Sequence, residues 1–371
     1  MGDSLPRPLP GRQAPDRTAR KRRRCPGPAL RPRAWPPLPA GSGARSGTPA
    51  SSSSAPRAVV RLRYGVGRAD ALEAGAGHRP LVQFSDPSSR GDRHAEARIR
   101  QQWEGAAPGW ARWEATVAAW MEPATEAMLA MAHVDAGARV LDLACGAGSQ
   151  TLDAARRVGA HGSVIASDIS ETMLDLVRAN ARAAGLTNVT TLAGAAEDLD
   201  VAAESFDAII CRLGLMLFVD PARALMAVAR ALRPEGRVAV VVFTTPVTNP
   251  FMAKPMQILL RHAGKAPPAP GEPGIFALGS PRVLEPLLTG TGFVGVEQRT
   301  LDVPLRMPSA AEALTMMKEA FGAYRAVISD RPEVVRAPAW AEVAETLNTF
   351  ETSTGFMAPA EVLVAAGVKP T

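Results

Sequence analysis

The stretch VLDLACGAGSQT, residues 140–151, joins an apolar run to the predicted start of a helix through a turn of small residues. An acid, Asp142, stands near the end of the apolar run, and Gly146 and Gly148 remove side chains from the turn. A turn without side chains lets a ligand approach backbone N–H groups at the start of a helix. This stretch therefore predicts a ligand site where a strand becomes a helix.

On either side of this turn, short β-branched runs alternate with amphipathic helical patterns. Ser170, Asp220 and the glycines at 159 and 185 stand where helix caps belong. Residues 233–236 are predicted to form a tight turn. The predicted strands span residues 138–143, 163–167, 188–192, 206–211 and 237–243, and the predicted helices span residues 149–158, 171–184 and 221–232.

Strands separated by helices of this length form a parallel sheet that helices cover on both faces. Ligands bind at the carboxyl ends of such strands. The alternation therefore places residues 142–148, Asp168 and residues 211–213 along one edge of the sheet, facing one crevice.

The spacing between the glycine turn and the next strand-end acid indicates a nucleoside cofactor. Asp168 lies 20 residues after Gly148, where an acid accepts hydrogen bonds from ribose hydroxyls. NAD and S-adenosylmethionine (SAM) both fit this pattern, but a dinucleotide site has a third glycine where this chain has Thr151. The carboxylate of Asp142 suits a ligand with an ammonium and a sulfonium better than one with phosphates. The turn therefore favours SAM.

Five motifs, in order and at matching spacing, resemble those of the class I SAM-dependent methyltransferases, particularly the ubiquinone/menaquinone biosynthesis group. The resemblance is strongest over residues 110–245 and extends loosely to Lys369. It implies an α/β fold: a Rossmann-like, doubly wound, mostly parallel seven-stranded sheet with helices on both faces and a helical insertion on the substrate side. The motifs are VLDLACGAG, VIASDIS with ETML, AGAAEDL, FDAIICRLGLMLFVDP and ALRPEGRVAVVVF.

The resemblance implies roles for the residues that surround the glycine turn. Asp142, Gly146 and Gly148 would contact the methionine end of SAM, and Asp168 would contact the ribose. Ala144 stands where many members of the family have a glycine. Asp142 is alternatively a strand-end acid that bonds to backbone amides, and Asp168 is alternatively a companion of a helix cap.

The remaining cofactor residues follow the same resemblance. Ile169 would lie on the adenine face, and Ala196 and Glu197 would line the adenine. Ala195 stands where the family has an aspartate that accepts from the adenine amino group. Glu197 or Asp198 is expected to compensate for that missing acid.

Cys211 and Arg212 would form the floor beneath the transferred methyl group by the same resemblance. As a thiol, Cys211 is expected to be a small buried filler rather than a nucleophile, like Cys145. The three cysteines are widely spaced, so no disulfide framework and no metal site is predicted.

Methyl transfer from a sulfonium requires mainly that the acceptor be aligned and water excluded. No catalytic residue is therefore obligatory. A phenol would still benefit from a base, and His262 is the candidate, with a helix-surface imidazole as the alternative. The expected reaction is O- or C-methylation of a small, lipophilic, quinol- or phenol-like acceptor, and the acceptor class has to be read from the segments outside the motifs.

Two features bear on that acceptor. Trp110, Trp113, Val117 and Trp120 form an aromatic stripe on a predicted helix, which either packs in the core or covers the cofactor, with Trp103 extending the cover. Two insertions, at about 244–280 and 305–356, carry methionines and aromatics. The second insertion contains predicted helices at 309–328 and 339–350, and a final strand is predicted after it, at 361–366. These side chains either suit a lipophilic acceptor or seal the insertion. They are Met252, Met256, Met316, Met317, Phe321 and Tyr324.

Charge is divided unevenly along the chain. Residues 1–100 hold 20 of the 42 Lys and Arg but 7 of the 36 Asp and Glu. Residues 1–95 are predicted to be a disordered, basic Pro/Arg/Ser-rich tail. The alternative is that translation starts near Leu81 or Val82, downstream of Met1. Residues 96–371 are predicted to form the methyltransferase domain.

The acidic body lacks a basic surface for phosphate contacts, so no nucleic acid is expected as its partner. No apolar run is long enough to span a bilayer, and a cytoplasmic location is expected. Two other functions remain open: an NAD-dependent oxidoreductase on the same scaffold, and a non-catalytic SAM-binding or nucleic-acid-associated protein that works through its basic tail.

Overall fold

The computed structural model describes residues 59–61, 83–85, 90–269 and 271–371. Strands β1 (Val59–Arg61) and β2 (Gln83–Ser85) pair antiparallel. The predicted basic tail otherwise lies outside the described residues, up to the first turns of helix α1 (Arg90–Met131). Within the described part of the chain, no helix is long and apolar enough to cross a membrane.

Seven strands form one sheet in the order β5-β4-β3-β6-β7-β12-β8. The first five are parallel, and β12 is antiparallel to both of its neighbours. The central strands are apolar on both faces, as strands covered on both sides must be. The predicted mostly parallel seven-stranded sheet is confirmed. The strands are β3 (Arg139–Leu143), β4 (Ser163–Asp168), β5 (Val189–Ala193), β6 (Phe206–Arg212), β7 (Leu232–Phe243), β8 (Val294–Asp302) and β12 (Glu361–Val368).

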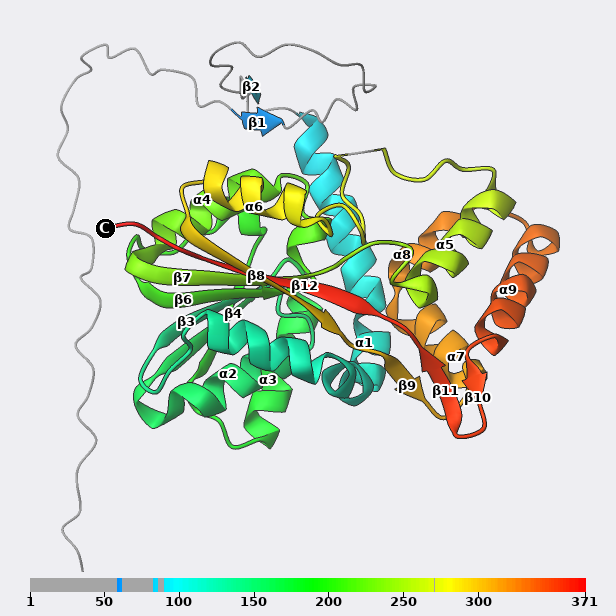
Figure 1. Ribbon diagram of the computed structural model, residues 1–371, viewed down its shortest axis with the longest axis horizontal. Coiled ribbons are helices and arrows are strands. Elements are labelled where there is room, and N and C mark those ends of the chain that lie inside the picture. The colour runs from blue at the N-terminus through cyan, green and yellow to red at the C-terminus, as the bar shows by residue number, and fades with distance from the viewer. Residues whose placement is uncertain (1–58, 62–82, 86–89, 270) are drawn as a thin grey trace, which may run out of the picture. The chain divides into compact units, whose positions relative to one another are not determined.

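Helices cover both faces of this sheet. Helices α2 (Ser149–Val158) and α3 (Glu171–Ala183) lie on one face, and α4 (Pro221–Ala231) and α6 (Pro281–Gly290) lie on the other (Figure 1). The two predicted N-caps are confirmed: Ser170 Oγ accepts from Met173 N at 3.3 Å, and Asp220 Oδ1 accepts from Arg223 N at 2.9 Å. These caps fix where the crossover helices begin.

Strand β7 starts five residues earlier than predicted, and the predicted turn at 233–236 lies within it. The pairing with β6 moves from Phe206–Leu232 to Ala208–Arg237, so three extra residues of β7 loop out between these pairs. Glu235 takes a φ of 64° there. The turn is therefore absorbed as an irregularity of the strand.

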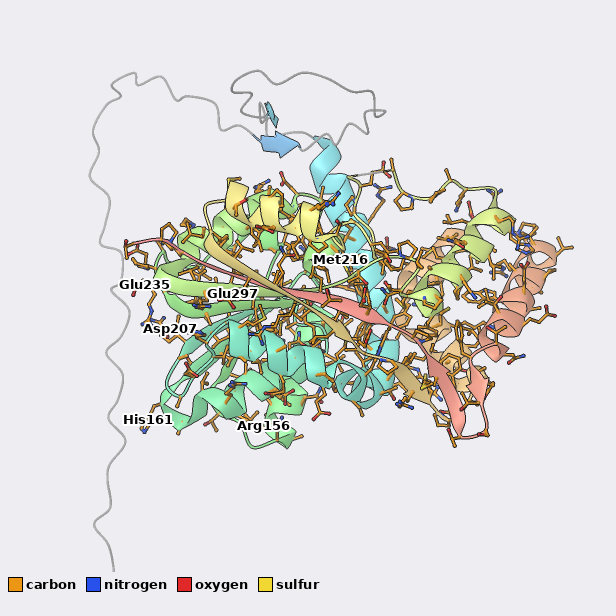
Figure 2. All side chains as sticks on the ribbon, viewed as in Figure 1. Arg156, His161, Asp207, Met216, Glu235 and Glu297 are labelled. Carbon is orange, nitrogen blue, oxygen red and sulfur yellow. The ribbon has the colours of Figure 1, made fainter. Side chains whose placement is uncertain are left out.

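The carboxyl ends of the strands meet at one edge of the sheet. Figure 2 shows His161, Asp207 and Glu235 together at the opposite edge, where the strands begin, and Met216 at the other end, beyond β6. The loops after β3, β4 and β6 therefore gather on the side of Met216. This is the edge where the sequence predicts the ligand site.

The insertions form a second group of helices with a small sheet. Helices α5 (Pro250–Ala263), α7 (Ala310–Ala320), α8 (Gly322–Ile328) and α9 (Glu333–Asn348) accompany the antiparallel strands β9 (Leu305–Met307), β10 (Glu351–Thr352) and β11 (Gly355–Ala358). The predicted helix at 309–328 is wrong as a single element, because the backbone at Phe321 (φ −93°, ψ 81°) leaves the helical region. Arg325 donates to the carbonyls of Lys318 and Glu319, which the break leaves without helical partners.

Helix α9 begins at Glu333, earlier than the predicted start at 339, and runs through Pro338. The insertion's methionines mostly pack inside: Met252, Met316 and Met317 are buried, and the Tyr324 hydroxyl donates to the carbonyl of Met252 at 2.8 Å. These side chains seal the insertion, which was the second of the two interpretations.

Helix α1 continues through Pro108 and Gly109. A Cβ on Gly109 would lie 2.0 Å from the carbonyl oxygen of Glu319. The absence of that atom lets α1 and α7 cross with their backbones in contact.

The pair Gly109→Ala and Gly105→Ala tests this crossing. Gly109→Ala forces the two backbones apart and is expected to lower the free energy of unfolding by about 1–3 kcal/mol or more. A Cβ on Gly105 meets nothing within 4 Å, so Gly105→Ala is expected to raise it by about 0.5–1 kcal/mol, the helix-propensity gain. Urea denaturation of both variants measures these values. Equal effects of the two substitutions would contradict the close crossing.

Candidate functional site

The glycine turn is held against the neighbouring strand. The backbone N–H of Cys145 donates to the carbonyl of Ser167 at 3.0 Å. Gly146 and Gly148 have φ values of 56° and 95°, in the left-handed region that favours glycine. A Cβ on Gly146 would meet nothing within 4 Å, whereas one on Gly148 would lie 2.9 Å from Cγ2 of Val177. Gly148 therefore allows close packing on α3, and Gly146 keeps open space above the turn.

Ala144 also lies in the left-handed region, with a φ of 52°. Only glycine adopts this conformation without strain, so alanine there costs roughly 1 kcal/mol. A Cβ on Gly214 would lie 2.5 Å from the Cβ of Ala144. Gly214, after β6, therefore provides the room that the methyl group of Ala144 takes up.

Asp142 is fully buried beneath the turn. Thr151 Oγ1 donates to its Oδ2 at 2.5 Å, and Gln150 Nε2 lies 3.3 Å from its Oδ1. Burial is the main cause that raises the pKa of Asp142 to about 7, against the two hydrogen bonds, which lower it. Thr151 stands where a dinucleotide site has its third glycine, and here its hydroxyl donates to the carboxylate of Asp142. The sequence suggested no such role for Thr151 or Gln150.

Asp168 binds the glycine turn to the start of α3. Its Oδ2 accepts from Gly146 N at 3.0 Å, and its Oδ1 accepts from Ser170 N at 2.9 Å. Burial raises its pKa, and the backbone hydrogen bonds oppose that shift. Asp168 therefore accompanies the cap of α3, as one of its two interpretations had it, and also reaches the loop after β3.

The residues expected around an adenine lie on a short helix, η2 (Ala196–Asp198). Ala196 is buried, and Glu197 Oε1 accepts from Val219 N at 3.0 Å and from Asp220 N at 3.3 Å. Asp198 forms an ion pair with Arg223. Both acids expected to compensate for Ala195 thus already have partners on the segment that leads into α4.

Arg212 is buried at the end of β6, with 8% of its surface exposed. Its Nη1 donates to Thr125 Oγ1 at 2.9 Å and its Nη2 to Ser149 Oγ at 2.7 Å. Burial lowers its pKa to about 10, although the nearby Asp142 favours the charged form. No carboxylate lies within ion-pair distance of Arg212 among the described residues. Arg212 is thus a buried cation that two hydroxyls hold, one of them in the first turn of α2. Such a cation beside a helix N-terminus can bind an anionic group.

The two cysteines beside the site are not nucleophiles in this setting. Burial raises the pKa of Cys211 to about 12 and raises that of Cys145 well above its ordinary value. Both thiols therefore stay protonated at neutral pH, as expected for buried fillers. No cluster of metal-ligating side chains occurs in the described part of the chain.

Helix α1 contributes three contacts to this edge that sequence reasoning missed. Arg100 Nη1 donates to the carbonyl of Ile169 at 2.9 Å. Asn180 Nδ2, on α3, donates both to Glu114 Oε2 at 2.7 Å and to the carbonyl of Ala147 at 3.0 Å. Thr125 of α1 also accepts from Arg212. Helix α1 therefore contacts the carboxyl ends of all three strands β3, β4 and β6.

His262 is not brought to this edge. It lies on α5, and its Nε2 is 2.9 Å from Oε2 of Glu342 on α9. The aromatic stripe divides as well: Trp113 Nε1 donates to Glu319 at 2.7 Å and Trp120 Nε1 to the carbonyl of Val303 at 2.6 Å, both from buried positions. Those two tryptophans pack in the core.

Comparison with known proteins agrees with this geometry. Residues 134–257 match a family model described as a methyltransferase domain. The nocamycin O-methyltransferase of Saccharothrix syringae is 33% identical over 214 residues, which cover 54% of this chain and 75% of that protein. The ubiquinone/menaquinone biosynthesis C-methyltransferase UbiE of Proteus mirabilis is 40% identical over 114 residues, 30% of this chain and 45% of that relative. This chain thus matches less than half the length of UbiE.

A solved structure, the Haemonchus contortus phosphoethanolamine N-methyltransferase 2 in complex with S-adenosyl-L-methionine, is 16% identical with a TM-score of 0.43 and covers 67% of this chain and 53% of that one. The matched family model spans the glycine turn and the ends of β3, β4 and β6. Because this chain also covers three quarters of an O-methyltransferase that is 33% identical to it, it belongs to the class I methyltransferases, which take the methyl group from S-adenosylmethionine.

Proposed function

We propose that this chain transfers the methyl group of SAM to a hydroxyl oxygen or a ring carbon of a small, lipophilic, phenol- or quinol-like acceptor. The names of its relatives support both outcomes, since one is an O-methyltransferase and the other a C-methyltransferase. The observation that carries the proposal is the pair of buried, opposite charges beside the glycine turn, Asp142 and Arg212.

These two groups match the methionine end of SAM, which carries an ammonium and a carboxylate. Asp142 would hold the ammonium, and Gln150 Oε1, a buried acceptor without a partner among the described residues, would add to it. Arg212 and the first turn of α2 would hold the carboxylate, beside the floor that Cys211 would form. The open space above Gly146 leaves room for the carbon chain that joins these two groups to the sulfur. The donor set therefore fits the cofactor.

The other end of SAM would extend toward β4 and η2. Asp168 would accept from the ribose hydroxyls, Ile169 would lie on the adenine face, and Ala196 and Glu197 would line the adenine. When bound, SAM supplies an electrophilic methyl carbon on a positively charged sulfur. The chain's own part is to bind, orient and exclude water, which suffices for direct displacement.

Calorimetric titration of the full chain with SAM, S-adenosylhomocysteine and NADH tests the cofactor site, and methyl-labelled SAM with a panel of phenols and quinols tests the transfer. Binding of both adenosyl ligands without NADH, together with a labelled organic product, is the expected result. Adenosyl binding with transfer to none of these acceptors would overturn the proposed acceptor class.

Asp168→Asn is expected to weaken SAM binding by about 10- to 100-fold, because a hydrogen bond to a charged acceptor contributes about 1.5–3 kcal/mol. Asp175→Asn, on the exposed side of α3, is the matched control and should bind SAM as the unaltered chain does. Calorimetry measures both affinities. Equal affinities for the two variants would exclude Asp168 from the ribose site.

The affinity for SAM is expected to fall as the pH falls through 7. The pKa of Asp142 is raised to about 7, so below that pH the carboxyl is protonated and cannot pair with the ammonium. The apparent dissociation constant should be roughly tenfold higher at pH 6.0 than at pH 7.5.

The same raised pKa lowers the stability of the free protein as the pH rises from about 4 to 7, because the unfolded chain has already lost this proton.

Titrations with SAM in two buffers of different ionisation enthalpy measure the proton released on binding. Asp142→Asn should bind SAM weakly, with no dependence on pH over this range and no proton release. A pH-dependent affinity that persists in Asp142→Asn would assign the titration to another group.

A further inference from the structure

One face of α1 turns toward the strand ends. At 3.6 residues per turn, Arg100, Trp103, Trp110 and Glu114 fall within about 80° of the helical wheel. Arg100 and Glu114 reach the loops after β4 and β3, through Ile169 and Asn180. The two tryptophans between them therefore stand over the same edge of the sheet.

Trp110 differs from the other tryptophans of the stripe. Its indole nitrogen is sealed from solvent, yet it has no hydrogen-bond acceptor among the described residues. The corresponding N–H groups of Trp113 and Trp120 are both used. A buried donor without a partner costs about 1–3 kcal/mol, and such a group in a folded protein requires an explanation.

The rings around this donor are not fully packed. Trp110 contacts Trp103 at 6.3 Å and Phe321 at 6.2 Å between ring centroids. All three are only partly buried, unlike the core residues Trp113, Trp120 and Tyr324. Phe321 stands at the break between α7 and α8. The three rings offer flat apolar surface with one unused donor, as a planar aromatic ligand with an oxygen requires.

A carboxylate lies one helical turn from this donor. Glu114 follows Trp110 by four residues, so their Cβ atoms are about 5–6 Å apart on the same face. Asn180 holds its Oε2, and no described hydrogen bond uses its Oε1. Burial raises the pKa of Glu114 above its ordinary value, which makes it a stronger base than an exposed glutamate.

We propose that Trp103, Trp110 and Glu114 form the acceptor subsite: a planar hydroxyaromatic acceptor stacks on the rings, its oxygen accepts from the indole N–H of Trp110, and its hydroxyl donates to Glu114. The inference rests on the proposed methyl transfer and names the acceptor class and the base for O-methylation. During transfer, the acceptor oxygen forms a bond to the methyl carbon while the carbon–sulfur bond breaks. The electron pair of that bond goes to the sulfur, and the hydroxyl proton goes to the Glu114 carboxylate.

The donor is tested by nuclear magnetic resonance of the full chain labelled with ¹⁵N-tryptophan and saturated with S-adenosylhomocysteine. Trp110→Phe assigns the Trp110 indole resonance among the six tryptophans. Phenol, catechol and 2-naphthol are the probes, and we expect at least one to shift this resonance. Trp340→Phe, on α9, is the matched control and should leave the Trp110 shift unchanged. If none of the three probes moves the Trp110 resonance, the subsite is overturned.

The base is tested by Glu114→Gln with the probe that shifts Trp110. Its kcat is expected to fall about 10²–10⁴-fold, and the rise of kcat with pH that a carboxylate base should give the unaltered chain is expected to vanish. Glu126→Gln, an exposed glutamate of α1 paired with Arg157, is the control and should keep both. A Glu114→Gln variant with the unaltered pH profile would refute the role of the base. In the variants at Trp110, Trp340, Glu114 and Glu126, the dissociation constant of S-adenosylhomocysteine should stay unchanged. Failure of the unaltered chain to bind this ligand would instead contradict the proposed function.

Discussion

Desolvation of charged groups at the carboxyl ends of three adjacent parallel strands is the constraint on which the site depends. Asp142 on β3, Asp168 on β4 and Arg212 on β6 are all buried, and burial is the largest cause of each of their pKa shifts. Such groups are tolerated only when hydrogen bonds hold them. The partners are the first turn of α2, the glycine turn, the start of α3 and Thr125 of α1, so all these segments are positioned around the three charges.

Helix α1 connects the two parts of the structure around that edge. On one side it contacts the strand-end loops through Arg100, Glu114 and Thr125. On another side Gly109 allows it to cross α7 with backbone contact, and Trp113 donates to Glu319 of the same helix. One helix therefore packs both on the sheet and on the insertion.

The apolar residues that drew attention to the acceptor have two different roles. Trp113, Trp120, Met316 and Met317 are buried and complete the core between α1 and the insertion. Trp110 lies on the same helix but on the arc that faces the strand ends, and its N–H is unused. Trp110 and Trp113 point about 60° apart around the helix axis. This rotation places Trp113 in the core and leaves Trp110 available to a ligand.

The sequence by itself determined the crossover part of the fold, because strand and helix periodicity, caps and turns are local properties. Strands β3 to β6 lie within one residue of their predicted bounds, and parallel strands necessarily bring the residues after them to one edge. Tertiary structure decided the rest. The hydrogen bond from Thr151 to Asp142, the break at Phe321, the pairing of His262 with Glu342 and the approach of Glu114 to Asn180 depend on side chains and segments that meet only after packing. Local pattern contains no information about such contacts, since the same residues on an isolated helix would face water.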